Sequence, residues 1–106
     1  MTKFELVTLA EEKQYGRFHV DWWKNNEVSS DSWYLELCLL QKWLREDHKI
    51  NIWMQDWDKL GYGFDVTSTQ GDVMFASTKP FKTYEEALEK ALYESLKFIE
   101  NDDKTK

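Results

Sequence analysis

Apolar residues recur with a helical period in the middle of the chain. Trp33, Leu37, Leu40 and Leu44 follow one another at i, i+4, i+7 and i+11. This spacing brings them onto one face of a helix. The preceding residues 29–32, SSDS, are of the types that favour helix N-caps. The pattern predicts an amphipathic helix over residues 32–48.

A second amphipathic helix is predicted near the end of the chain, within FKTYEEALEKALYESLKFIE (81–100). Thr83 and Glu86 have the spacing of a capping box. The apolar stripe that follows comprises Tyr84, Ala87, Leu88, Ala91, Leu92, Leu96 and Ile99. Glu85 and Glu86 suit the first turn, where the helix dipole favours negative charge. The glutamates of this segment therefore indicate a cap and a solvated face, with no pair arranged for proton transfer.

Three segments between these helices alternate in the manner of strands. Residues 50–57 and 62–67 alternate on either side of a turn at 58–61, which predicts a hairpin. The turn residues Gln70-Gly71-Asp72 then lead into a third strand over 73–77.

The N-terminal third is predicted to hold shorter elements. KFELV (3–7) alternates weakly and indicates a short strand. Thr8 and Glu11 have capping-box spacing and Gly16 is a suitable stop, so a short helix is expected over 9–15. Residues 17–22 alternate again as a strand, and Asn25-Asn26 supplies a turn.

These elements predict an α+β fold, with an antiparallel sheet of three to four strands and two long helices packed on one face. The 106 residues fit a single domain, 1–106, in which residues 1–3 and 101–106 are expected to be frayed.

Two segments resemble a known group of proteins. They are QKWLREDHKINI (41–52) and PFKTYEEALEKALYESLKFI (80–99), accompanied by FELVTL (4–9). Together they resemble a family of small uncharacterised proteins from gut bacteria and their phages. In that family a helix ending in Trp-Leu-Arg-Glu-x-His leads into a strand, and a Tyr-Glu-Glu-Ala-Leu helix closes the chain. The resemblance covers about half of the chain. It implies a small α+β domain of phage or mobile-element origin and supplies no catalytic residues.

Charge argues against nucleic acid as a partner. The chain carries 14 basic and 20 acidic residues, a net charge of −6, whereas nucleic-acid binding draws on Lys and Arg that neutralise phosphates. The predicted order of helix, three strands and helix is also that of double-stranded RNA-binding domains. Those domains place lysines at the start of the last helix, where this chain has Glu85 and Glu86.

Composition also limits the compartment. No apolar run approaches the roughly 20 residues of a membrane span, and the acidic N-terminal segment is unlike a secretory signal. The single cysteine, Cys38, has no partner for an internal disulfide. We therefore expect a cytoplasmic protein with no membrane association, and the resemblance implies that the cell is a bacterial host.

No residue pattern indicates catalysis, a metal or a cofactor. Cys38 lies among leucines, as a small buried residue would, and His19 and His48 are too far apart in sequence for paired zinc ligands. The hairpin-region carboxylates lack the spacing of a calcium-binding loop; they are Asp56, Asp58, Asp65 and Asp72. We expect no catalytic residues, no bound metal, no cofactor and no enzyme activity.

Aromatic content gives the main indication of function. Six Trp, five Tyr and six Phe are many for so short a chain. Each buried aromatic removes about 150–250 Å² of surface from water, so a domain of this size is expected to leave some of them at a surface or interface. Alternation assigns Ile50, Ile52 and Met54 to the core side of the first hairpin strand, and Tyr62, Phe64 and Val66 to the core side of the second. It leaves Trp53 and Trp57 on the opposite face.

The same alternation adds Asp65 and Met74 to this second face, and it assigns Val73 and Phe75 to the core side. Trp22 and Trp23 are adjacent on a predicted strand, so only one of them enters the core. The candidate partner-binding residues are Trp53, Trp57, Met74, Asp65 and Trp23. The alternative is that the N-terminal segment, through Trp22 or Trp23, covers this face as a second small core.

The leading hypothesis is a non-enzymatic, phage-associated protein-interaction module. It binds a protein partner or itself, as a homodimer, through an aromatic and acidic surface. One alternative is a phage-encoded inhibitor of a bacterial defence protein that acts through acidic surface. Another is a small-molecule binder or minor enzyme that uses the Trp53/Trp57 face with Asp65.

Overall fold

A computed structural model of the chain describes residues 3–18 and 27–99. In order, its elements are α1 (Lys3–Glu12), α3 (Ser30–Asp47), β1 (Ile50–Asp56), the short 3₁₀ helix η1 (Asp58–Leu60), β2 (Tyr62–Ser68), β3 (Val73–Ala76) and α4 (Tyr84–Leu96). The predicted α+β class is confirmed.

Helix α4 begins where the sequence predicts, and α3 begins at Ser30, two residues before the expected start at residue 32. The Ser29 hydroxyl accepts a hydrogen bond from the Ser32 N–H at 3.2 Å, and the Thr83 hydroxyl accepts one from the Glu86 N–H at 3.1 Å. Each bond satisfies an N–H that the helix itself leaves without a partner. Both caps therefore set the first residue of the helix that follows.

The sheet is antiparallel, with strand order β1-β2-β3. The predicted hairpin is confirmed, with Trp53 opposite Asp65 at its centre. The described residues form three strands. The sequence predicts a strand over 17–22, but Arg17 lies in a turn and Phe18 is the irregular residue that follows it. The remaining residues of this predicted strand, His19 and Trp22 included, and the Asn25-Asn26 turn lie outside the described residues.

The predicted N-terminal helix, 9–15, is wrong at both of its ends. Residues 3–7 do not form a strand but the first half of α1. Leu6, Val7 and Ala10 are fully buried on one side of this helix, which packs against α4. The helix also ends earlier than expected, because Gln14 takes the left-handed backbone conformation, at φ 69°, two residues before Gly16.

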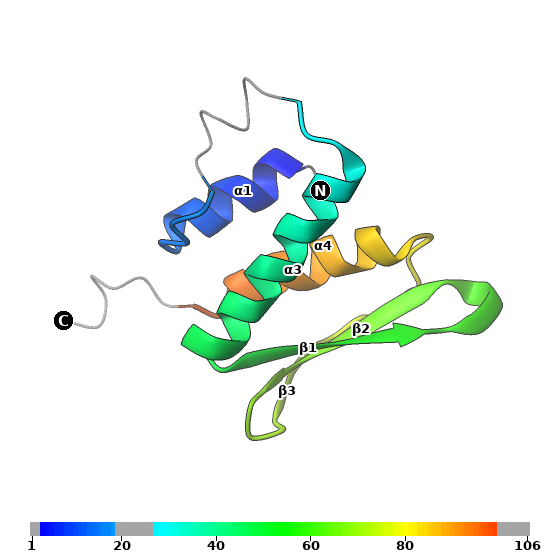
Figure 1. Ribbon diagram of the computed structural model, residues 1–106. Coiled ribbons are helices and arrows are strands. Elements are labelled where there is room, and N and C mark those ends of the chain that lie inside the picture. Colours follow the sequence, from blue (N-terminus) through cyan, green and yellow to red (C-terminus); the bar gives the residue numbers. More distant parts are fainter. Residues whose placement is uncertain (1–2, 19–26, 100–106) are drawn as a thin grey trace.

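Figure 1 shows how the layers are arranged. Helices α3 and α4 pack against one face of the sheet, α3 over β1 and α4 over β1 and β2. Helix α1 packs against α4 and lies on the side of the helices away from the sheet. The opposite face of the sheet is covered by none of the described helices (Figure 1).

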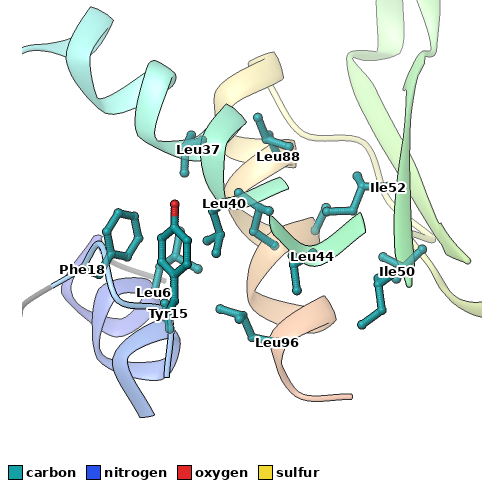
Figure 2. Close-up of a cluster of buried hydrophobic side chains, with 14 of the residues drawn as sticks. Leu6, Tyr15, Phe18, Leu37, Leu40, Leu44, Ile50, Ile52, Leu88 and Leu96 are labelled. Carbon is teal, nitrogen blue, oxygen red and sulfur yellow. The ribbon is translucent and has the colours of Figure 1, made fainter. Parts of the chain in front are cut away.

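The core lies between the helices and the sheet. Figure 2 shows Ile50 and Ile52 directed from β1 toward the leucines of α3 and α4. Phe64 and Val66 of β2 are fully buried with them. The predicted core side of the hairpin is therefore confirmed.

A cluster of aromatic rings joins the end of α1 to α3. The ring centroid of Tyr15 lies 5.0 Å from that of Phe18 and 4.9 Å from that of Trp43. Phe18 stacks on Trp33 at 6.0 Å. The exposed Arg17 guanidinium donates to both carboxylate oxygens of Glu36, at 2.7 and 2.9 Å. Part of the unusual aromatic content is thus accounted for by packing among helices.

Tyr15 makes the stability of the protein sensitive to alkaline pH. Burial, and secondarily the negative charge of Glu36, raise the pKa of Tyr15 from 10.0 to about 12. The folded state disfavours the phenolate. The contribution of neutral Tyr15 to the free energy of unfolding is therefore fully present below pH 10 and is lost as pH rises from 10 to 12. Between these two pH values the free energy of unfolding falls by an amount on the order of 2–3 kcal/mol.

We expect the free energy of unfolding in urea to fall more steeply above pH 10 for the wild type than for Tyr15→Phe, which lacks the titrating group. Parallel pH profiles for the two proteins would contradict the assignment.

Candidate functional site

The sheet face turned away from the helices is called the outer face below. In an antiparallel sheet, residues directly opposite each other project to the same side. The observed register therefore assigns eight residues to the outer face: Asn51, Trp53 and Gln55 of β1, Gly63, Asp65 and Thr67 of β2, and Val73 and Ala76 of β3. The only charged residue among them is Asp65.

Trp53 is the large exposed residue at the middle of the outer face. Its side chain is 57% exposed, yet its indole N–H donates to the Thr67 hydroxyl at 2.9 Å. This bond directs the ring diagonally from β1 toward β2. Because the only polar atom of the ring is satisfied within the protein, the surface that Trp53 presents to solvent is apolar and held in one orientation.

Trp57 lies on the outer face one residue beyond the end of β1. Its indole N–H donates to the Gln55 side-chain oxygen at 2.8 Å. Its ring covers Gly63, where an added Cβ would lie 2.4 Å from two ring carbons. Trp57 is therefore half-buried and packed onto the sheet, in contrast to Trp53.

Asp65 stands directly opposite Trp53. The Gln55 side-chain amide donates to its Oδ2 at 2.9 Å, so a chain of hydrogen bonds runs from Trp57 through Gln55 to Asp65. Among the described residues, none donates to Asp65 Oδ1 and none forms an ion pair with this carboxylate. The structure thus brings three of the predicted residues together: Trp53, Trp57 and Asp65.

The expected position of Met74 is wrong. Val66 pairs with Phe75 and Thr67 with Val73, which leaves Met74 as an extra residue between the two pairs. This bulge exchanges the faces expected for Val73 and Met74, whereas Phe75 and Ala76 keep theirs. Met74 consequently packs against the core, while Val73, expected in the core, is 66% exposed on the outer face.

The described part of the N-terminal segment does not cover the outer face, contrary to the alternative that it forms a second small core there. Residues 3–18 pack with the helices, on the side away from the sheet. Trp22 and Trp23 lie outside the described residues.

The other residues considered for chemistry lie in separate surroundings. His48 caps α3, where its backbone N–H donates to the Leu44 carbonyl, and its ring packs on Trp43 with centroids 4.5 Å apart. His19 lies outside the described residues. Within residues 3–18 and 27–99, no three His, Cys, Asp or Glu side chains gather as a metal site would need.

Cys38 is half-buried rather than fully buried, and it lies beside two tyrosines. Burial, with smaller effects of Cys38, Tyr84 and Glu85, raises the pKa of Tyr34 to about 12. Because its pKa is raised, Tyr34 is neutral near pH 7 and supplies no base there.

Comparison with known proteins adds no relative, since no family model, curated protein or solved structure matches the chain. None of the helices in the described part of the chain is both long and apolar enough to span a bilayer.

Proposed function

We propose that this protein is a non-enzymatic interaction module that binds a protein partner, or a second copy of itself, through the outer face of its sheet. The resemblance of residues 41–52 and 80–99 to proteins of gut bacteria and their phages supports a phage or mobile-element association, and with it a bacterial cytoplasm as the place of action.

The observation that carries this proposal is the state of Trp53. Tryptophan is enriched among the residues that dominate the energy of protein interfaces. Here the ring is 57% exposed, and its N–H is already bonded to Thr67. A partner that covers the ring removes apolar surface from water and loses no hydrogen bond in doing so. Because the ring is held in place beforehand, little side-chain entropy is lost on binding.

The surroundings of Trp53 also favour a macromolecular partner over a small molecule. Small ligands bind in concave sites. Two surface hollows, of about 520 and 310 Å³, are lined by residues such as Lys49 and Phe98, or Phe4 and Tyr93, and neither includes a residue of the outer face. The outer face instead presents the exposed side chains of Trp53 and Val73 from different strands. Trp53 donates to the Thr67 hydroxyl, and Val73 stands directly opposite Thr67.

A photo-crosslinking amino acid placed at Ala76 provides the experimental test. Ala76 is exposed on the outer face two residues from the β3 bulge, and a probe at the exposed Lys42 of α3 serves as the matched control. The protein crosslinked from position 76 but not from position 42 is purified, and its affinity is measured for the wild type and Trp53→Ala.

We expect Trp53→Ala to weaken this complex by at least about 2 kcal/mol, roughly thirtyfold, as truncation of an interface tryptophan does. If the crosslinked species is a second copy of the chain, the same loss appears as dissociation in sedimentation equilibrium. Equal affinity of wild type and Trp53→Ala would overturn the proposal.

A further inference from the structure

The Asp65 carboxylate points to the chemistry of the partner. It is the only charged group among the residues of the outer face, and within the described part of the chain it forms no ion pair. Its Oδ2 is held by Gln55 at 2.9 Å, and no described residue donates to Oδ1. The carboxylate is thus fixed in position while one oxygen remains available to a cation.

Trp53 supplies a second attraction for the same cation. It stands directly opposite Asp65, and residues so paired in an antiparallel sheet typically have their Cβ atoms about 4.5–5.5 Å apart. The face of an indole ring attracts cations, more strongly than the rings of Tyr or Phe. The exposed Trp53 ring and the Asp65 carboxylate belong to directly opposite residues of β1 and β2. They therefore favour the same ligand, a positively charged group that lies over the ring and donates to Asp65 Oδ1.

Charge in the rest of the protein agrees with a basic partner. The chain has a net charge of −6, and no Lys or Arg belongs to the outer face. Such a field attracts basic surfaces and speeds their association.

We propose that Trp53 and Asp65 form a site for one arginine side chain of the partner protein. This inference rests on the proposed function and names the residue type that the outer face recognises. Arginine fits better than lysine, because its planar guanidinium stacks on an aromatic ring while its edge donates to a carboxylate. A lysine ammonium is a compact, strongly hydrated charge that lacks a stacking plane.

The site is tested by titrating the ¹⁵N-labelled full chain with three blocked tripeptides, Gly-X-Gly, in which X is arginine, lysine or citrulline. Citrulline retains the shape of arginine and lacks its charge. The readout is the indole Nε1–H resonance of Trp53. We expect a saturable shift with the arginine peptide, with roughly fivefold or greater weakening for lysine and citrulline.

Two variants locate the carboxylate. Asp65→Asn is expected to bring the affinity for the arginine peptide down to that for the citrulline peptide. Glu46→Gln removes the same charge from an exposed position on α3 and is expected to leave the affinity within a factor of about two. Equal shifts with arginine and citrulline, no saturable shift with arginine, equal affinity for arginine and lysine, or equal loss in the two variants would overturn the site.

Failure of this inference is distinguishable from failure of the proposed function. If the arginine peptide does not bind and Trp53→Ala still weakens the purified complex, the outer face is an interface of other chemistry. If Trp53→Ala leaves the complex unchanged, the proposed function itself fails.

Discussion

Phe64→Ala is expected to lower the free energy of unfolding by about 3–5 kcal/mol. Phe64 is fully buried on the core side of β2. Its ring lies 5.8 Å from that of Phe75 and 6.0 Å from that of Phe81. Truncation leaves a cavity that these two rings, fixed on their own segments, fill only in part. Urea unfolding followed by far-UV circular dichroism measures the loss.

Val73→Ala is the matched control on the same sheet. Its side chain is 66% exposed on the outer face, so we expect a change within about 0.5 kcal/mol. A loss of less than about 1 kcal/mol for Phe64→Ala, or a comparable loss in both variants, would contradict the assignment of the two sheet faces.

Gly63→Ala is expected to destabilise the protein by roughly 2 kcal/mol or more, although alanine is ordinarily compatible with a strand. The cause is the ring of Trp57, since an added Cβ would stand 2.4 Å from Cε2 and Cζ2. The ring would have to leave the sheet, which also breaks the bond from its indole N–H to Gln55. Thermal and urea unfolding give the loss, and the Trp57 indole resonance reports the displacement.

A double-mutant cycle separates this cause from others. In a Trp57→Ala background there is no ring to displace, so Gly63→Ala should cost less than about 0.5 kcal/mol. If Gly63→Ala is as harmful without Trp57 as with it, the close approach of the ring is not the reason for glycine at this position.

The elements predicted well from sequence are those whose signals are local. Ser29 and Thr83 each set the start of a helix through a hydrogen bond within three residues. The hairpin alternation places Trp53 and Phe64 on opposite faces without any information from elsewhere in the chain. Such local consistency is what a single sequence expresses most plainly.

The N-terminus shows the limit of local patterns. KFELV has few residues, and its apolar positions suit a short strand and one side of a helix equally. Packing against α4 stabilises the helical form, because Leu6 and Val7 are buried between the two helices. No residue near KFELV carries that information.

The outer face was predictable in its centre and not at its edge. Trp53 and Asp65 follow from alternation alone. The exchange of Met74 for Val73 depends on one extra residue in β3. The turn before β3 gives no sign of it, because the bulge arises from pairing with β2. The role of Gly63 likewise appears only when Trp57 is seen against it.

The central claim is that Trp53 belongs to a surface for a partner and not to a second core. The free energy of unfolding of Trp53→Ala, measured in urea beside Phe64→Ala, tests this most directly. Because the ring is 57% exposed and donates a single hydrogen bond, we predict a loss of about 1 kcal/mol or less. A loss of about 3 kcal/mol or more, equal to that of Phe64→Ala, would show that Trp53 is covered within the folded protein and would contradict the account.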